Sequence, residues 1–376
     1  MNFLNTFASL FSNFGNLTWQ MVVMWGIGAL LIYLAIAKKM EPSLLLPMGF
    51  GAILVNLPLS GAITQGETVG PISALFEAGM SNELFPLLLF IGIGAMIDFG
   101  PLLEKPWLML FGAAAQFGIF VTLVLAGLFF DLPDAASIAV IGAADGPTAI
   151  FVANTLGSKY LGAIMVAAYS YMALVPIVQP PVIRLCTTKK ERLIRMPYQK
   201  GSVSKTTKIL FPIVVTMLAG LVAPASVALV GFLMFGNLLR ECGVLNALSE
   251  TAQNVLANLI TIVLGLTVAG QMTADKFVRP DTLLILALGL VAFIFDTAGG
   301  VFFAKLLNLF LPEGKKINPM IGAAGISAFP MSGRVVNQMG LAEDNQNFLL
   351  MYSISVNVSG QIASVIAGGL LLTLLS

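Results

Sequence analysis

The sequence contains 376 residues, of which 58% are hydrophobic and only 10% are charged. Soluble domains carry charged side chains at about a quarter of their positions, so this composition excludes an ordinary soluble protein. The formal net charge of +1 gives no reason to expect nucleic acid or another acidic partner. The chain has no histidine, so acid–base chemistry falls to other side chains. The two cysteines, Cys186 and Cys242, do not have the spacing of a metal site.

Apolar segments follow one another along the whole chain after residues 1–18, which we expect to form an interfacial N-terminal helix. Most are close to the roughly 20 residues that cross a bilayer. They lie at residues 19–37, 43–60, 83–99, 107–130, 135–155, 158–180, 209–223, 226–240, 253–271, 282–311, 317–340 and 346–375. The pattern predicts an all-α polytopic membrane protein with about ten transmembrane helices and two segments of another kind.

The distribution of Lys and Arg indicates which loops face the cytoplasm. Residues 184–208 contain eight of the nineteen Lys and Arg but a single acid, Glu191. By the positive-inside rule this stretch is a basic cytoplasmic linker, and Lys38-Lys39 lies on the same side. The loops at 61–82 and 131–134 carry acids and no bases, which favours the external side.

With both Lys39 and Arg184 on the cytoplasmic side, the apolar segments between them cannot all cross the membrane. Five full crossings after Lys39 would put Arg184 outside, so one segment must enter and leave on the same side. The segments at 135–155 and 317–340 are interrupted by Gly and Pro, and we expect both to be re-entrant or discontinuous.

The residues on either side of the basic linker resemble each other. The run Gly142-Ala-Ala-Asp-Gly returns as Gly322-Ala-Ala-Gly-Ile, and other small motifs recur in the same order. We therefore predict two transmembrane repeats, at 19–183 and 209–376, of opposite orientation. Inverted repeats with broken helices at the membrane midplane are typical of ion-coupled secondary transporters.

Asp145 stands at the centre of the first interrupted segment, within Gly-Ala-Ala-Asp-Gly-Pro-Thr-Ala-Ile-Phe. Pro147 prevents a regular helix there, and a carboxylate at membrane depth is a functional-site hypothesis by default. The alternative is a kinked helix in which Asp145 only caps the second half.

The second interrupted segment supplies neutral oxygens and close backbone approach. Asn318 and Ser327 would complete an oxygen site with Asp145, and its single formal charge suits a monovalent cation or a proton. Gly322 allows backbone or ligand to approach closely. The alternative is that Asn318-Pro319 simply forms a turn.

Four further side chains are candidates. Arg334 either holds a carboxylate in bidentate fashion or extends to the cytoplasmic surface. Tyr171 either donates a proton or anchors its helix at an interface. Asp296 lies near the middle of its span and is a second candidate for ion or proton binding. Asp98 lies near a cytoplasmic end, where capping or solvation explains it as well as function does.

The motifs around Asp145, Asp98 (Ile-Gly-Ala-Met-Ile-Asp-Phe-Gly-Pro) and Asn318 (Ile-Asn-Pro-Met-Ile-Gly), with Ser327 and Arg334 following, resemble the β subunits of sodium-translocating, biotin-dependent decarboxylases. The resemblance covers nearly the whole chain. It implies a carboxybiotin decarboxylase subunit that couples release of carbon dioxide to sodium export and proton uptake.

The resemblance also implies residue roles and partners. It places functional residues at Asp145, Tyr171, Asn318, Gly322, Ser327 and Arg334. We expect catalysis by Asp145, Tyr171 and Arg334, carboxybiotin binding by Arg334 and Gly322, and sodium binding by Asp145, Asn318 and Ser327. Asp296, which the family pattern does not place, is added to the sodium ligands. The chain has no biotinylation motif, so carboxybiotin comes from a biotin-carrier subunit, beside a carboxyltransferase subunit and a small membrane subunit. We expect an oligomeric, multi-pass protein of a bacterial inner membrane.

Two other functions remain open from the residues alone. A stand-alone sodium- or proton-coupled transporter of an anionic solute would use the same oxygen site and the same arginine. A non-catalytic membrane anchor has no reason to accept the desolvation cost of polar groups in both interrupted segments. The carboxylic acid or acyl-CoA on which the complex acts is chosen by another subunit.

Overall fold

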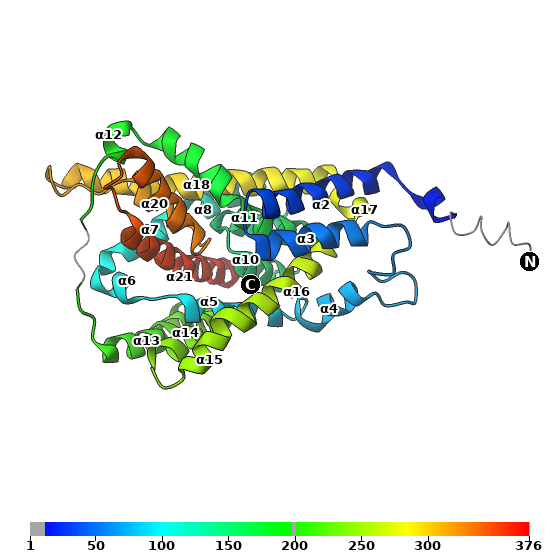
Figure 1. Ribbon diagram of the computed structural model, residues 1–376, viewed down its shortest axis with the longest axis horizontal. Helices are drawn as coiled ribbons and strands as arrows, with labels where there is room; N and C mark the ends of the chain where they lie inside the picture. Colours follow the sequence, from blue (N-terminus) through cyan, green and yellow to red (C-terminus); the bar gives the residue numbers. More distant parts are fainter. Residues whose placement is uncertain (1–11, 198–200, 376) are drawn as a thin grey trace, which may run out of the picture. The chain divides into compact units, whose positions relative to one another are not determined.

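The computed structural model describes residues 12–197 and 201–375 as helices joined by loops (Figure 1). Within that part of the chain, extended pairing is limited to one isolated bridge between Gln65 and Thr68. The described part of the expected N-terminal helix is a short 3-10 helix, η1 (Ser12–Asn16), and residues 1–11 lie outside the described residues. The expected all-α class agrees with these elements.

The described residues pack into two compact units, one within residues 1–85 and 258–284 and one within residues 86–257 and 285–376. These packing units do not coincide with the two halves 19–183 and 209–376. The inverted repeat therefore stays a prediction.

The first unit contains helices α2 (Trp19–Ala37), α3 (Pro42–Val55) and α4 (Pro71–Gly79), most of α16 (Ala257–Ala269), α17 (Ala274–Phe277) and the start of α18 (Pro280–Phe310). Helices α2 and α3 lie side by side (Figure 1).

Two glycines set the close approach of α2 and α3. A Cβ atom on Gly28 would lie 2.7 Å from the carbonyl oxygen of Gly49, and the reverse distance is also 2.7 Å. Small residues of this kind let membrane helices pack backbone to backbone.

Asn56 connects the end of α3 to the start of α17. Its Nδ2 donates to the carbonyl of Met272 at 2.7 Å, and its Oδ1 accepts from the amide of Ala274 at 2.7 Å.

The second unit contains most of the chain. Its elements up to the basic linker are α5 (Leu84–Met96), α6 (Gly100–Glu104), η2 (Pro106–Leu108), α7 (Met109–Ala115), α8 (Phe117–Ala126), α9 (Leu132–Ala139), η3 (Val140–Ala143), α10 (Gly146–Thr155), α11 (Leu161–Cys186) and α12 (Lys189–Arg192). After the linker come α13 (Lys205–Val222), η4 (Pro224–Ser226), α14 (Val227–Glu241), α15 (Asn246–Glu250), the π-helix η5 (Thr251–Leu256), the rest of α18, α19 (Met320–Ala323), α20 (Met331–Glu343) and α21 (Leu350–Leu375).

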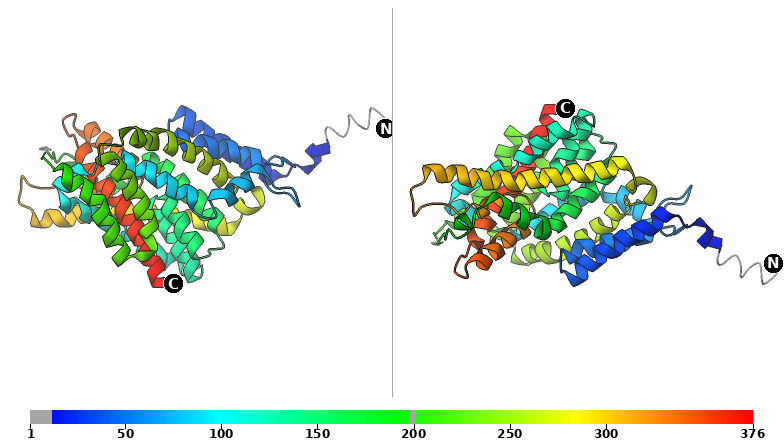
Figure 2. Two further views of the ribbon diagram at one scale, coloured as in Figure 1. Left: turned by 90° about the horizontal axis from the view of Figure 1, so that it is seen from below. Right: turned by 90° about the horizontal axis from the view of Figure 1, so that it is seen from above.

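Helix α21 is the central element of this unit, because it is buried along most of its length and packs against α7, α10 and α20. Figure 2 shows it in red between green and teal helices of the same unit. Glycines permit the tight contacts: a Cβ on Gly112 would lie 2.5 Å from the carbonyl oxygen of Ser359, and Gly360 lies directly against the backbone of Gly325. Polar side chains on α21 are therefore held inside the protein.

Seven helices of the described residues are long and apolar enough to cross a membrane, or eight if the bent pair α4 and α5 forms one span. Three more of the expected crossings are the shorter helices α3, α5 and α14, which have 14, 13 and 15 residues. At 1.5 Å per residue these are shorter than a hydrocarbon core of about 30 Å. The protein is a multi-pass helical membrane protein, and the number of ten crossings is not confirmed.

Both expected interruptions are present. The segment at 135–155 is divided between α9 with η3 on one side and α10 on the other, and the segment at 317–340 is divided between α19 and α20. We refer to residues 144–145 as the first break and to residues 324–330 as the second break.

Candidate functional site

The first break places the carboxylate of Asp145 at the start of a helix. Ala144 adopts the left-handed conformation (φ 51°) and Asp145 is extended. Asp145 Oδ1 accepts a hydrogen bond from the amide of Thr148 at 3.4 Å, and Thr148 Oγ1 donates to Oδ2 at 2.8 Å. Pro147 lacks an amide hydrogen, which is why the helix restarts here with a side-chain cap. Asp145 does cap α10, as the simpler alternative required.

The second break meets the first at this carboxylate. The amide of Ser327 donates to the carbonyl of Ala143 at 2.8 Å, and Ser327 Oγ donates to Asp145 Oδ2 at 3.0 Å. Helix α21 adds two more donors to Oδ2, Ser364 Oγ at 2.7 Å and Gln361 Nε2 at 3.2 Å. The hydroxyl oxygens of Ser364 and Ser327 are 3.0 Å apart. Four donors on one oxygen are far more than a helix cap needs.

Burial and charge give this cluster its chemistry. Asp145 is 2% exposed, and none of the ion pairs formed by the described residues includes it. Its neighbours are neutral hydroxyls, whose lone pairs can rotate toward a cation. The described residues contain no group of three or more acidic, histidine or cysteine ligands. One buried carboxylate among hydroxyls suits a monovalent cation or a proton rather than a divalent metal.

Sequence reasoning predicted Asp145 and Ser327 but missed Thr148, Gln361 and Ser364. Thr148 follows Asp145 by three residues, which is the spacing of a helix cap. Gln361 and Ser364 lie on the last helix, where Asn357, Gln361 and Ser364 are spaced four and three apart and so share one face. That spacing was a usable signal. Asn357 is fully buried, and its Nδ2 donates to the carbonyl of Ile326 at 2.7 Å while its Oδ1 has no partner among the described residues.

The structure does not bring Asn318 to Asp145. Asn318 Nδ2 donates to the carbonyls of Arg192 and Ile194, both at 2.9 Å, and its Oδ1 accepts from the amide of Met320 at 3.1 Å. No hydrogen bond among the described residues joins Asn318 and Asp145. Asn318 instead ties the start of the second interrupted segment to the basic linker.

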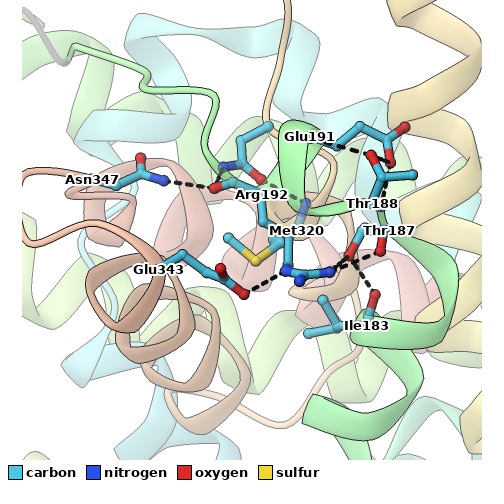
Figure 3. A network of polar contacts seen from close by, with 9 residues as sticks. Ile183, Thr187, Thr188, Glu191, Arg192, Met320, Glu343 and Asn347 are labelled. Atoms are coloured by element: carbon cyan, nitrogen blue, oxygen red, sulfur yellow. Dashed lines mark hydrogen bonds and ion pairs between the residues drawn. The ribbon is translucent and has the colours of Figure 1, made fainter.

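The linker around α12 is itself fixed by a polar network, which Figure 3 shows from close by. Arg192 forms an ion pair with Glu343 at 2.6 Å and donates to the carbonyl of Thr187 at 2.8 Å. Partial burial disfavours the charge of Glu191, yet its pKa is lowered, because Thr188 and Lys305 donate hydrogen bonds to its carboxylate. The part of the linker around α12 thus contacts the ends of α18 and α20.

Gln179 on α11 supports the second break from one side. Its Nε2 donates to the carbonyl of Ala323 and to Ser332 Oγ, both at 2.7 Å, and its Oε1 accepts from Ser332 Oγ at 3.0 Å. Ala323 ends α19 and Ser332 lies in the first turn of α20. A fully buried amide therefore connects the two sides of the break.

Gly322 and Arg334 differ in their surroundings. Gly322 packs directly on the backbone of Gly300 in α18, so any side chain at either position would overlap the other helix. This packing accounts for a glycine at position 322 without any contact to a ligand.

Arg334 is exposed on α20, two residues after Ser332, and the ion pairs of the described residues do not include it.

Tyr171 and Asp296 do not bond to Asp145. The hydroxyl of Tyr171 donates to the carbonyl of Leu286 in α18. Asp296, fully buried on the same helix, accepts from the amide of Ile119 at 3.2 Å. Tyr169, which sequence reasoning did not select, lies closer to the cluster: its ring packs on Gly146, and its buried hydroxyl has no partner among the described residues.

Comparisons with known proteins place this chain among decarboxylase subunits. A family model described as Na+-transporting oxaloacetate decarboxylase beta subunit matches residues 20–375. The oxaloacetate decarboxylase beta chain of Klebsiella pneumoniae is 45% identical over 93% of this chain and 94% of its own length. The methylmalonyl-CoA decarboxylase subunit beta of Propionigenium modestum is 46% identical over 96% of this chain and 97% of its own length. The glutaconyl-CoA decarboxylase subunit beta of Acidaminococcus fermentans is 47% identical over 96% of this chain and 95% of its own length.

Proposed function

The chain belongs to the family of Na+-transporting oxaloacetate decarboxylase beta subunits, and on this premise we propose that it decarboxylates carboxybiotin presented by a partner subunit and couples this reaction to sodium export and proton uptake. Family membership favours this function over a stand-alone transporter. The observation that carries the proposal is the buried Asp145 carboxylate, which accepts hydrogen bonds from both interrupted segments and from α21.

Sodium, the transported substrate, binds between the two breaks. Asp145 supplies the charge, and the hydroxyls of Thr148, Ser327 and Ser364 supply neutral oxygens within 3.0 Å of Oδ2. The unpartnered Oδ1 of Asn357, whose amide nitrogen already bonds beside Ser327, is a further neutral oxygen. Hard oxygens with one formal charge neutralise a monovalent cation without an excess of negative charge. Asn318 acts by holding the second interrupted segment to the linker.

Carboxybiotin approaches from the cytoplasm, and the exposed guanidinium of Arg334 binds its carboxylate. The bond between the ureido nitrogen and the carboxyl carbon then breaks. Its electron pair stays on the nitrogen, carbon dioxide leaves, and a proton is added to the ureido group. Transfer of the carboxylate from water into a drier site favours this charge-dispersed path, and a positioned acid delivers the proton. Tyr171 or a protonated Asp145 is that acid in a chain without histidine.

Sodium and a proton compete for the same carboxylate, and this competition couples the two activities. A cation bound at Asp145 favours the ionised carboxylate and displaces its proton toward the biotin. Release of carbon dioxide then allows the two breaks to separate and to open the sodium site to the outside. Both breaks contribute to one hydrogen-bonded cluster, so neither moves without disturbing the other.

The other parts of the complex follow from what this chain does not carry. A biotin-carrier subunit delivers the carboxyl group, a carboxyltransferase subunit selects the acid, and a small membrane subunit completes an oligomer in a bacterial inner membrane. The three relatives are named for three different substrates at similar identity. The acid is therefore selected outside this chain.

The test is release of carbon dioxide from free carboxybiotin by the purified chain, measured with sodium and with potassium. Release that requires sodium is expected. A chain that binds sodium but leaves carboxybiotin intact would contradict the decarboxylase function and favour the transporter. Release at the same rate in both salts would contradict coupling.

A further inference from the structure

Asp296 is a second buried carboxyl that the cation cluster does not use. It lies in the middle of α18 and is fully buried. Oδ1 accepts from the amide of Ile119 at 3.2 Å, whereas Oδ2 has no hydrogen-bond partner among the described residues. The first interrupted segment lies against it: a Cβ on Gly142 would be 2.7 Å from Oδ2.

The surroundings of Oδ2 suit a proton and not a metal ion. No Lys or Arg of the described residues pairs with Asp296, and an unpaired buried carboxylate is very costly. Sodium would need several oxygen ligands around it. The same Cβ on Gly142 would instead lie 2.5 Å from the Cβ of Ala292 and 2.8 Å from its carbonyl carbon, so apolar and backbone atoms fill this space.

Other titratable groups face this region from two elements. On α11, the hydroxyl of Tyr171 donates to the carbonyl of Leu286, and its ring lies against Gly289. On the first interrupted segment, Asp145 follows Gly142 by three residues. Helix α8, which supplies the amide of Ile119, has no titratable side chain between Phe117 and Ala126. The charged residues of α18 other than Asp296 are Asp281 and Lys305, which lie toward its ends.

One face of α18 therefore carries Asp296 and contacts Tyr171 of α11, along the flank of the first interrupted segment. Leu286, Gly289, Ala292 and Asp296 follow one another at intervals of three and four residues, which is the spacing of a single helix face. Gly289 also contacts Ile141, the residue before Gly142. A displacement of the first break thus changes the packing on Asp296 directly.

We propose that Asp296 is a proton-binding site coupled to the first break. With Gly142 packed against it, Asp296 carries a proton on Oδ2. When sodium binds at Asp145 and the first break shifts, Oδ2 is uncovered, the O–H bond breaks, and the proton leaves to water or to a neighbouring acceptor. This inference rests on the proposed function, because it takes sodium binding at Asp145 as the event that moves the break.

Infrared difference spectroscopy on the full chain in lipid, sodium minus potassium, tests the proposal. A carbonyl band of a protonated carboxylic acid is expected to change when sodium replaces potassium, and deuterium oxide should shift this band to lower frequency. Asp296→Asn should remove this band and Asp296→Glu should move it, whereas an acid band that belongs to Asp145 should persist in both variants. Thr297→Val, which removes the neighbouring buried hydroxyl on the same helix, is the matched control and should keep it.

The outcomes separate this inference from the proposed function. If Asp296→Asn leaves the acid band unchanged, or if the wild-type protein shows no acid band, the proton site is refuted while sodium binding at Asp145 stands. If Asp145→Asn leaves the whole sodium-induced difference spectrum intact, the cation site itself is refuted. If one Asp296 variant fails to fold, the other decides the assignment, because Asp296→Asn removes the band and Asp296→Glu moves it, whereas Thr297→Val leaves it in place.

Discussion

Removal of the Ser364 hydroxyl tests whether α21 contributes an oxygen to the cation site, which the sequence did not predict. Ser364 Oγ lies 2.7 Å from Asp145 Oδ2 and 3.0 Å from Ser327 Oγ, so Ser364→Ala removes a neutral oxygen from the centre of the cluster. A hydrogen bond to a charged group contributes about 1.5–3 kcal/mol. Because 1.4 kcal/mol corresponds to a factor of ten, the sodium concentration for half-maximal activity should rise about tenfold or more.

The assay is carbon dioxide release as a function of sodium concentration, with Ser355→Ala as the matched control. Ser355 is buried on the same helix, but its hydroxyl donates to the carbonyl of Met351 one turn earlier and does not contact Asp145. The control should keep the wild-type sodium dependence. Equal sodium dependence of the two variants would refute the assignment of α21 to the cation site.

Three further predictions concern the substrate, the proton and the packing of the second interrupted segment. Arg334→Ala should raise the KM for carboxybiotin with a smaller effect on sodium binding, and steady-state kinetics at saturating sodium would contradict this if KM stayed unchanged. Tyr171→Phe should slow decarboxylation by about a hundredfold or more, as expected for loss of a general acid, while sodium affinity is retained; normal turnover would assign the proton to Asp145 or to water. Gly322→Ala should destabilise the protein by about 1–3 kcal/mol, because its Cβ overlaps the backbone of Gly300. A thermal melt would contradict that account if Gly231→Ala, where a Cβ meets only Thr216 at 3.7 Å, lowered the Tm as much.

The sequence was sufficient to locate both interruptions, since Pro and Gly act locally on the backbone. Pro147 removes an amide from the helix ladder, and together with Gly146 and the buried acid before it this indicated the position of the first break. The contact between the breaks was also expected, and the hydrogen bond from Ser327 to Asp145 confirms it. Both inferences rest on short stretches of chain and on the cost of a carboxylate in a membrane.

The remainder of the site depends on tertiary packing that no local pattern specifies. Asn318 has the right chemistry for a cation ligand, but its amide is used by the carbonyls of Arg192 and Ile194, more than a hundred residues away in sequence. The spacing of Asn357, Gln361 and Ser364 indicates a polar face on α21, but it does not say which side chains reach Asp145. Serines at other positions on that helix, such as Ser355, bond to their own helix backbone. Composition does not distinguish such serines from Ser364.

In the proposed mechanism, sodium transport and decarboxylation share the Asp145 carboxylate. The most direct measurement is sodium uptake into inverted vesicles that contain the whole complex, together with carbon dioxide release, for Asp145→Asn and for Asp131→Asn. Asp131 is an exposed acid whose carboxylate pairs with Lys159 at 2.8 Å, so its variant controls for loss of a carboxylate elsewhere. The proposed mechanism predicts that Asp145→Asn abolishes both activities while Asp131→Asn keeps both. An Asp145→Asn complex that still releases carbon dioxide and accumulates sodium at the wild-type rate would contradict it.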